Sequence, residues 1–262
     1  MICVSLKGRM CNQMFQMAAA KALSLDNNTG FVCSNIISGI TPTNLETKKH
    51  RMTIFNQIDF TNFSTNNRSF HDDSGDFSYK QIDYRENLCL TGYYQSEMYF
   101  KHRAEDITSL FKCPEKIEKF LFKKFQKILD NKETCAVHVR RGDYLKYKDF
   151  HNNLGTSYYS ACFEEMNQKH LVFFSDDIQW CRENFKNLNA SFINTGSDVI
   201  DFYLMSKMQN NVIANSSFSW WAAWLNQNKN KTVLAPKNWF GPKNSFLKTD
   251  DLIPKTWTVI DA

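Results

Sequence analysis

The sequence predicts an α/β protein with two Rossmann-like halves, residues 1–130 and residues 131–262. Short apolar runs alternate with helical segments over residues 134–235, a pattern typical of right-handed βαβ units and a parallel sheet. The chain also begins with an apolar strand, a polar loop and an Ala-rich helix, and its 262 residues are enough for two such units. We therefore expect the two halves to face a central ligand cleft.

The elements of the first half follow from apolar runs and helical spacing. We predict strands at 2–6, 31–33 and 88–94, and helices at 14–25 and 107–111. The second helix ends before Pro114, because the residue before a proline disfavours helical geometry. Residues 38–85 have no clean periodicity and are rich in Asn, Thr, Ser and Asp, so no element is predicted there.

The clearest helix covers residues 115–130, where an apolar stripe lies on one face and lysines fill the other. The regular alternation follows it. We predict strands at 135–139, 171–174, 191–193, 211–214 and 232–235, and helices around 159–166, 178–185, 198–208 and 220–225. The strand at 232–235 closes the predicted series.

The composition excludes several classes of protein. Aromatic residues make up 15% of the chain, which provides a sizeable core and excludes disorder. The net charge of +5 suits an anionic small ligand at least as well as nucleic acid, and no dense basic run indicates nucleic-acid binding. Eight scattered cysteines without a Cys-x-x-Cys pair, with no signal peptide or membrane-length apolar segment, favour a cytoplasmic protein without a membrane anchor.

The segment His138-Val139-Arg140-Arg141-Gly142-Asp143-Tyr144 places two arginines at the end of a predicted strand. Ligands of open α/β sheets bind beyond the carboxyl ends of the strands, and guanidinium groups placed there commonly bind phosphate. The alternative is an arginine pair held in surface salt bridges, with Gly142 serving only a turn.

Small hydroxyl residues follow another predicted strand, in Ala214-Asn215-Ser216-Ser217-Phe218. Ser217 or its neighbour would cap the next helix, whose N-terminal N–H groups and dipole favour an anion. Together with Arg140, this loop would form a phosphate cradle. Taken alone, it is an ordinary helix cap with buried tryptophans behind it.

The turn Gly8-Arg9-Met10-Cys11-Asn12-Gln13 has the position of a phosphate-binding turn but lacks the G-x-G-x-x-G pattern of a nicotinamide site. Arg9 and Asn12 either face the cleft or belong to a turn that caps the first helix.

Asp176 and Asp177 are two carboxylates at a strand end. They could bind a divalent metal, accept hydrogen bonds from a ligand, or favour the N-terminus of the next helix, with Ser175 or Asp176 as its cap. An adjacent Asp pair is a weak metal signature, so we expect no metal site.

Five blocks of the sequence together resemble the α-1,2-fucosyltransferases, within the wider group of GDP-fucose-using enzymes with the GT-B fold. The blocks are Gly8-Arg9 with Asn12 to Gln16, Leu90 to Ser96, His138 to Tyr144, Phe174 to Asp177, and Ile213 to Trp221. The resemblance implies a GT-B fold and inverting, metal-independent transfer of L-fucose from GDP-fucose to the 2-hydroxyl of a galactose-terminated glycan. It implies no cofactor besides the donor substrate, and it makes residues 1–130 the acceptor-side domain and residues 131–262 the GDP-fucose-binding domain.

The resemblance also implies roles for individual residues. Arg140 holds the β-phosphate of GDP and is the catalytic residue, Arg141 assists it, and His138 lies near the nucleotide. Asp176 accepts hydrogen bonds from the guanine edge, and Asp201 is a second acidic candidate. The other donor-site residues expected are Ser216, Ser217 and Phe218 in one half, Gly8, Arg9 and Asn12 in the other, and Asp143, unless it pairs with Arg141.

The family pattern usually has Gly where this chain has Cys11. If that position requires a positive φ, Cys11 is strained and the turn that holds Arg9 and Asn12 has a different shape. No general base stands out, because the loop 7–13 holds no carboxylate. The base is either a carboxylate from residues 38–85, or deprotonation follows bond breaking and needs no strong base.

Two other functions stay open from the sequence alone. One is transfer from a different nucleotide sugar, with Asp176 and Asp177 binding a metal. The other is a non-catalytic nucleotide- or glycan-binding protein that kept the fold. The sequence indicates neither the acceptor nor the oligomeric state.

Overall fold

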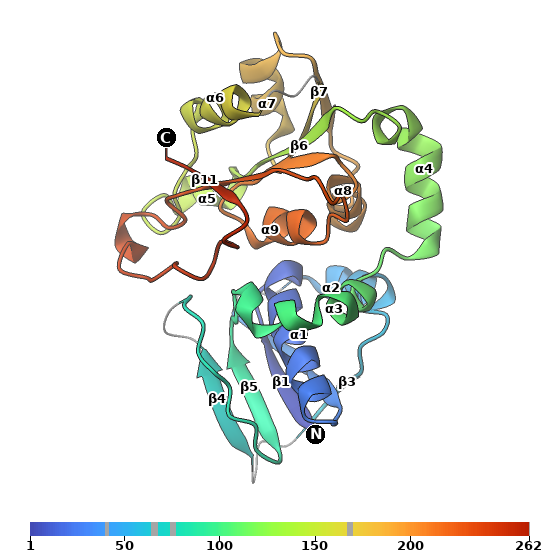
Figure 1. Ribbon diagram of the computed structural model, residues 1–262, viewed down its shortest axis with the longest axis vertical. Coiled ribbons are helices and arrows are strands. Elements are labelled where there is room, and N and C mark those ends of the chain that lie inside the picture. Colours follow the sequence, from blue (N-terminus) through green and yellow to red (C-terminus); the bar gives the residue numbers. More distant parts are fainter. Residues whose placement is uncertain (40–41, 64–67, 74–76, 167–169, 262) are drawn as a thin grey trace. The chain divides into compact units, whose positions relative to one another are not determined.

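The computed structural model of the protein describes residues 1–39, 42–63, 68–73, 77–166 and 170–261 (Figure 1). The chain divides into two compact units. Unit 1 comprises residues 1–113 and 247–254, and unit 2 comprises residues 114–246 and 255–262. The division thus falls after Cys113 and not after residue 130, the predicted boundary, and the segment 247–254 returns to unit 1.

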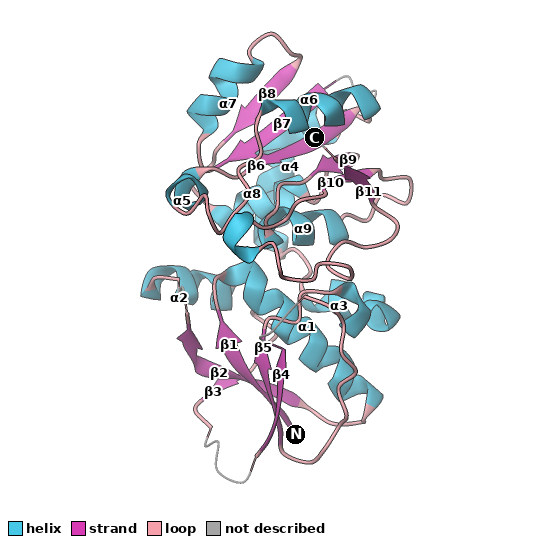
Figure 2. Ribbon diagram, turned by 90° about the vertical axis from the view of Figure 1, so that its left-hand side faces the viewer, coloured by secondary structure: helices cyan, strands magenta, loops and turns pink. Residues whose placement is uncertain are grey.

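Unit 1 contains a five-stranded parallel sheet with the strand order β3-β2-β1-β5-β4 (Figure 2). Its strands are β1 (Ile2–Lys7), β2 (Phe31–Ser38), β3 (Phe60–Thr61), β4 (Ser69–Asp73) and β5 (Leu88–Gly92). Its helices are α1 (Met10–Asp26), α2 (Asn44–Met52) and α3 (Ala104–Leu110), with the short 3-10 turns η1 (Glu97–Tyr99) and η2 (Lys101–Arg103). The Ala-rich α1 packs against β1, β2 and β5, and most of its side chains are buried.

Unit 2 contains a six-stranded parallel sheet with the order β11-β10-β9-β6-β7-β8. Its strands are β6 (Thr134–Val139), β7 (His170–Ser175), β8 (Ala190–Ile193), β9 (Asn210–Val212), β10 (Val233–Pro236) and β11 (Thr258–Ile260). Its helices are α4 (Glu115–Leu129), α5 (Gly142–Lys146), α6 (Thr156–Glu165), α7 (Ile178–Phe185), α8 (Asp198–Met205) and α9 (Ser217–Trp224), with the 3-10 turn η3 (Pro242–Asn244). This is the doubly wound order, in which the chain leaves β6 in one direction and later returns to its other side.

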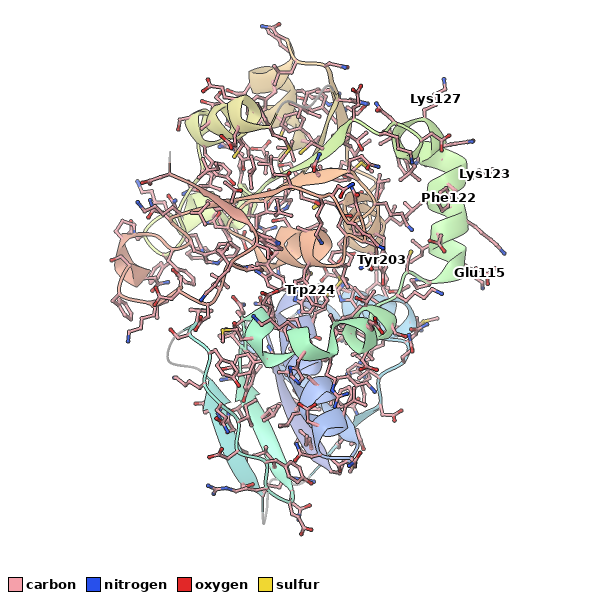
Figure 3. The ribbon with its side chains drawn as sticks, in the orientation of Figure 1. Glu115, Phe122, Lys123, Lys127, Tyr203 and Trp224 are labelled. Carbon is pink, nitrogen blue, oxygen red and sulfur yellow. The ribbon has the colours of Figure 1, made fainter. Side chains whose placement is uncertain are left out.

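The core of unit 2 explains why its strands could be predicted from the sequence. Every residue of β6 is buried, and β7 adds Phe173, whose ring stacks on Phe185 at 4.9 Å and on Phe192 at 5.2 Å. A strand buried on both faces is a continuous apolar run rather than an alternating one. In α4, by contrast, only Leu121 is buried, and Figure 3 shows Lys123 extending away from the rest of the unit.

Several expectations about elements were wrong. The predicted strand 88–94 ends at Gly92, the last residue of β5, and Tyr94 (φ 53°) has a left-handed backbone conformation that does not continue a strand. Residues 232–235 do not close the sheet, since β11 pairs beyond β10. Residues 38–85, for which no element was predicted, contain α2 and β4. The helix α5 begins within the arginine motif, where no helix was predicted.

No helix of the described residues is long and apolar enough to cross a membrane. None of the eight cysteines forms a disulfide, and all of them lie among the described residues.

The side chain of Gln16 fixes α1 to the end of β1. Its Nε2 donates to the Lys7 carbonyl oxygen at 2.9 Å, and its Oε1 accepts from the Lys7 N–H at 2.9 Å. Gln16 is fully buried, so no water can replace these bonds directly.

Replacing Gln16 with Leu is therefore expected to lower the free energy of unfolding by about 1–3 kcal/mol, since two hydrogen bonds are lost. Urea unfolding followed by circular dichroism measures the change. The control is Gln126→Leu on an exposed face of α4, which should change stability little. Equal stability of the wild type and Gln16→Leu would contradict this role.

Candidate functional site

The loops after β6 and β9 lie side by side, because these two strands are neighbours in the sheet and run in parallel. Ala136 pairs with Asn211 and Val137 with Val212. The chain order reverses between these strands, and ligands of open α/β sheets bind at such a reversal, beyond the carboxyl ends of the strands. The predicted arginine motif and the predicted serine loop therefore meet at the switch point of unit 2.

Arg140 is held by two carboxylates. Its Nη2 donates to Asp143 Oδ1 at 2.6 Å, and its Nη1 lies 3.0 Å from Asp176 Oδ2. The side chain is 23% exposed, and its guanidinium lies 5.3 Å from the centre of the Tyr144 ring. The alternative in which Asp143 pairs with Arg141 is not what the structure has, since Asp143 pairs with Arg140. Arg140 forms ion pairs, as in the alternative of an arginine pair held in surface salt bridges. Its side chain is half-buried, however, and the two carboxylates fix it in one orientation.

Arg141 is fixed separately. Its guanidinium Nε donates to Asp177 Oδ2 at 3.2 Å and lies over Trp180, 4.1 Å from the ring centre. Its backbone N–H donates to Asp176 Oδ1 at 2.9 Å. Asp177 also caps α7 by accepting from the Trp180 N–H at 3.2 Å, so the cap is Asp177 rather than Ser175 or Asp176.

Asp176 is the central acceptor of this cluster. Both of its oxygens are engaged, one by Arg140 and one by the Arg141 backbone. A Cβ atom on Gly142 would lie only 2.5 Å from Asp176 Oδ2, so the glycine permits the carboxylate to approach the motif. The guanine-binding role expected for Asp176 stays a prediction, and in this structure its oxygens bind arginine.

Tyr144 joins the two loops. Its hydroxyl donates to the Asn215 carbonyl oxygen at 3.0 Å, and its ring stacks on His151 at 4.0 Å. Asn215 is itself buried, with its Nδ2 donating to the carbonyl oxygens of Asn152 and Trp239 at 2.8 Å each. Tyr144 and Asn215 lie inside the predicted motifs, but no role could be predicted for them, because a bond to a backbone carbonyl leaves no sequence signal.

The serine loop begins α9. Ser216 is the N-cap, and its Oγ accepts from the Phe218 N–H at 3.3 Å. Ser217 is the first helical residue, and Phe218 packs its ring 5.5 Å from that of His138. The N-terminal end of α9, with its positive partial charge, therefore lies at the same strand ends as Arg140.

His138 lies behind the loops, in the core. It is 5% exposed, and its Nδ1 is 2.9 Å from Ser219 Oγ. Burial, reinforced by the nearby Arg140 charge, lowers the pKa of His138 to about 3. The imidazole is therefore neutral at neutral pH, and it contacts α9 through Ser219 and Phe218.

Asp201 is not joined to this cluster by any described contact. Its Oδ1 accepts from the Thr195 N–H at 3.2 Å and from Thr195 Oγ1 at 2.7 Å, which ties the loop between β8 and α8. Burial raises the pKa of Asp201.

The candidate residues of unit 1 lie in the turn between β1 and α1. Gly8 has φ +75°, and a Cβ there would lie 2.6 Å from Asn12 Nδ2, so the turn requires glycine. Arg9 is exposed at the N-cap of α1, and Asn12 Oδ1 accepts from Gln95 Nε2 at 3.0 Å. Cys11 lies within α1 and has no positive φ, so the strain considered for it is absent.

The arrangement in unit 2 can bind an anion by fixed guanidinium groups and helix N–H groups. Within the described parts of the chain, no group of three or more His, Cys, Asp or Glu side chains is placed to hold a metal ion.

The lowered pKa of His138 predicts a pH dependence of stability. Between its ordinary pKa of 6.5 and its folded value of about 3, the unfolded chain binds a proton that the folded chain does not. Stability should therefore fall as the pH falls through this window, by up to about 1.4 kcal/mol per pH unit. Urea unfolding at pH 7 and pH 5 should show a larger loss for the wild type than for His138→Gln, by about 2 kcal/mol. Parallel losses would show that His138 titrates normally.

Two curated relatives match nearly the whole chain, and a third matches most of it. An O-antigen biosynthesis glycosyltransferase of Escherichia coli, WbnK, is 28% identical, with 94% of this chain and 97% of that protein covered. An alpha-1,2-colitosyltransferase of Escherichia coli is 29% identical, with 98% and 97% covered. The bovine galactoside 2-alpha-L-fucosyltransferase SEC1 is 27% identical over 85% of this chain and 63% of its own length.

Solved structures support the fold. The alpha-1,6-fucosyltransferase NodZ, crystallised with GDP, superposes with a TM-score of 0.52 at 12% identity, covering 85% of this chain and 91% of that one. POFUT1 in complex with GDP-fucose gives 0.51 at 13% identity, covering 88% and 97%. The two parallel sheets and these neighbours confirm the expected GT-B type of fold. The model of glycosyl transferase family 11 matches residues 1–261. The chain therefore belongs to glycosyl transferase family 11, which confirms the resemblance to the fucosyltransferases seen in the sequence.

Proposed function

We propose that this enzyme transfers L-fucose from GDP-fucose to the 2-hydroxyl of a galactoside, with inversion and without a metal ion. The observation that supports this best is the fixed Arg140, placed beside the N-terminus of α9 at the switch point of a family 11 glycosyltransferase. The named activities of the relatives, galactoside 2-alpha-L-fucosyl transfer among them, agree with it.

In the proposed reaction the acceptor hydroxyl oxygen bonds to the anomeric carbon as the bond from that carbon to the β-phosphate oxygen breaks. GDP leaves with the bonding electrons, and the hydroxyl proton is released. Negative charge then grows on the diphosphate, where the guanidinium of Arg140 and the first N–H groups of α9 stabilise it as it forms. Inversion follows from a single displacement.

The charge balance of the cluster determines how a diphosphate binds. Two guanidinium groups, of Arg140 and Arg141, face three carboxylates, of Asp143, Asp176 and Asp177. A diphosphate therefore binds the guanidinium N–H groups beyond those the carboxylates use, or displaces Asp143. Asp143 is the more accessible partner, 36% exposed against 27% for Asp176. In this proposal Asp176 keeps Arg140 oriented while Asp143 yields to phosphate.

Removing the guanidinium tests the assignment. Arg140→Ala and Arg140→Lys are expected to lower kcat for transfer from GDP-fucose to lactose about 10²–10³-fold, because one fixed donor to the leaving group is lost. Lys keeps the charge but not the two-pronged geometry, so it should rescue little.

The matched control is Arg182→Ala, a surface arginine of the same unit whose Nη2 donates to the Phe192 carbonyl oxygen. It should retain wild-type transfer. Full activity of a folded Arg140→Ala protein would refute the proposal, and circular dichroism establishes that the variant is folded.

Chelation tests the absence of a metal. Transfer is expected to be unchanged by EDTA, because guanidinium and N–H groups meet the phosphate charge. Loss of transfer that Mg²⁺ or Mn²⁺ restores would instead favour the alternative with Asp176 and Asp177 as metal ligands. GDP binding without any turnover would favour a non-catalytic protein.

A second donor has a specific observation behind it, since a relative covered over 97% of its length is named an alpha-1,2-colitosyltransferase. Comparing kcat/KM for GDP-fucose and GDP-colitose with the same acceptor separates the two donors.

A further inference from the structure

The helix α4 lies at the surface of unit 2 with one face uncovered. Of its 15 residues only Leu121 is fully buried, although helices in proteins gain most of their stability by packing an apolar face. An ion pair fastens the helix to the loop after α8, where Lys207 Nζ lies 2.6 Å from Glu118 Oε1. Leu121 and Glu118 thereby define the inner side of α4, and its outer side faces solvent.

The outer side of α4 carries a basic face, formed by Lys116, Lys119, Lys123 and Lys127. All four lysines are exposed. The short spacings between the first three place them on one side of the helix. Lys127 lies one turn further along, and Figure 3 shows Lys123 and Lys127 extending away from the rest of the unit. Glu115 is the one carboxylate of the described residues that pairs with this face, since its Oε1 lies 2.5 Å from Lys119 Nζ.

This arrangement of lysines works against the helix itself. Lysines four residues apart on a helix surface repel one another, and Lys119, Lys123 and Lys127 have this spacing. A surface that serves only solubility mixes both signs of charge. A row of like charges that repel one another in the free protein indicates a negatively charged partner, whose binding relieves the repulsion.

Two exposed phenylalanine rings flank the basic face. Phe120 is 38% exposed and Phe122 is 49% exposed. An ammonium group lies near each ring, since Lys124 Nζ is 5.5 Å from the ring centre of Phe120 and Lys207 Nζ is 5.5 Å from that of Phe122. Aromatic rings beside lysines suit the surface of a lipid bilayer, where the rings enter the headgroup region and the lysines meet the lipid phosphates.

The chemistry of the basic face favours a lipid surface over a nucleic acid. The helix α4 contains five lysines and no arginine. The planar fork of arginine binds a phosphate in a fixed geometry, whereas lysine is a point charge on a flexible stem. A flexible point charge can follow the mobile headgroups of a fluid membrane. Clusters of four or more basic residues on an amphipathic helix are typical of binding to anionic lipids.

We propose that the outer side of α4 is a peripheral docking surface for a membrane that contains anionic phospholipids. The lysines of the basic face lie at the level of the lipid phosphates, and the rings of Phe120 and Phe122 enter the headgroup region. This inference goes beyond the proposed function and does not depend on it, because it involves no substrate of the reaction.

The test measures how much of the protein sediments with sucrose-loaded vesicles. Vesicles of phosphatidylcholine with about one-third phosphatidylglycerol should bind the protein, and vesicles of phosphatidylcholine alone should not. The triple variant Lys116→Gln, Lys123→Gln, Lys127→Gln is expected to weaken binding about a hundredfold, because each lysine near an anionic surface strengthens binding about fivefold. Binding of the wild type should also fall as the salt concentration rises to about 0.5 M.

The matched control is the triple variant Lys186→Gln, Lys229→Gln, Lys255→Gln, which removes the same charge from exposed positions elsewhere in unit 2. It should bind the vesicles as the wild type does. Phe120→Ala should weaken binding at every salt concentration, because the ring contributes apolar contact and no charge. Circular dichroism establishes that each variant is folded.

Equal losses in the two triple variants would show that net charge alone attracts the protein to the lipid, and this would overturn the proposal. An absence of sedimentation with the anionic vesicles would overturn it as well. Tighter binding to a single-stranded RNA than to the vesicles, lost in the α4 variant, would assign the basic face to a nucleic acid instead.

Discussion

The parallel pairing of β6 with β9 is the constraint on which the donor loops depend. Two segments more than seventy residues apart come together only because Ala136 and Val137 pair with Asn211 and Val212. Tyr144 then closes the gap between the loops with a bond to the Asn215 carbonyl oxygen. The loops after β6 and β9 are thus positioned by backbone pairing and by the Tyr144 hydroxyl, while the two arginines join the loop after β6 to Asp176 and Asp177 at the end of β7.

The carboxylates around the arginines have a cost and a benefit. A buried guanidinium without partners would be strongly destabilising, so Asp143 and Asp176 make its half-buried position tolerable. The same carboxylates reduce the attraction for an anion. In such a site the guanidinium groups are held in a fixed orientation, although their net positive charge is reduced. This suits a reaction whose negative charge appears only as the bond to the leaving group breaks.

Sequence reasoning recovered the elements whose apolar pattern is dictated by burial, and it recovered the loops that follow them. β6 and β7 are buried along nearly their whole length, so their apolar runs were unambiguous. It failed where a tertiary contact decides the structure. β4 has the sequence Ser-Phe-His-Asp-Asp and is a strand only because β5 pairs with it. Asp143 forms its ion pair with Arg140 and not with Arg141, and no rule of residue spacing predicts this geometry. The αL conformation of Tyr94 is equally invisible, because a tyrosine there contradicts local preference.

The return of residues 247–254 to unit 1 has a consequence for how the protein is made. Residues 1–113 are synthesised before the segment 247–254, which bonds to Phe77 and Tyr79. The contacts of Phe77 and Tyr79 with this segment therefore form only after residues 114–246, most of unit 2, have been synthesised. Neither unit corresponds to one continuous stretch of the gene, so neither can be expressed alone by a simple truncation.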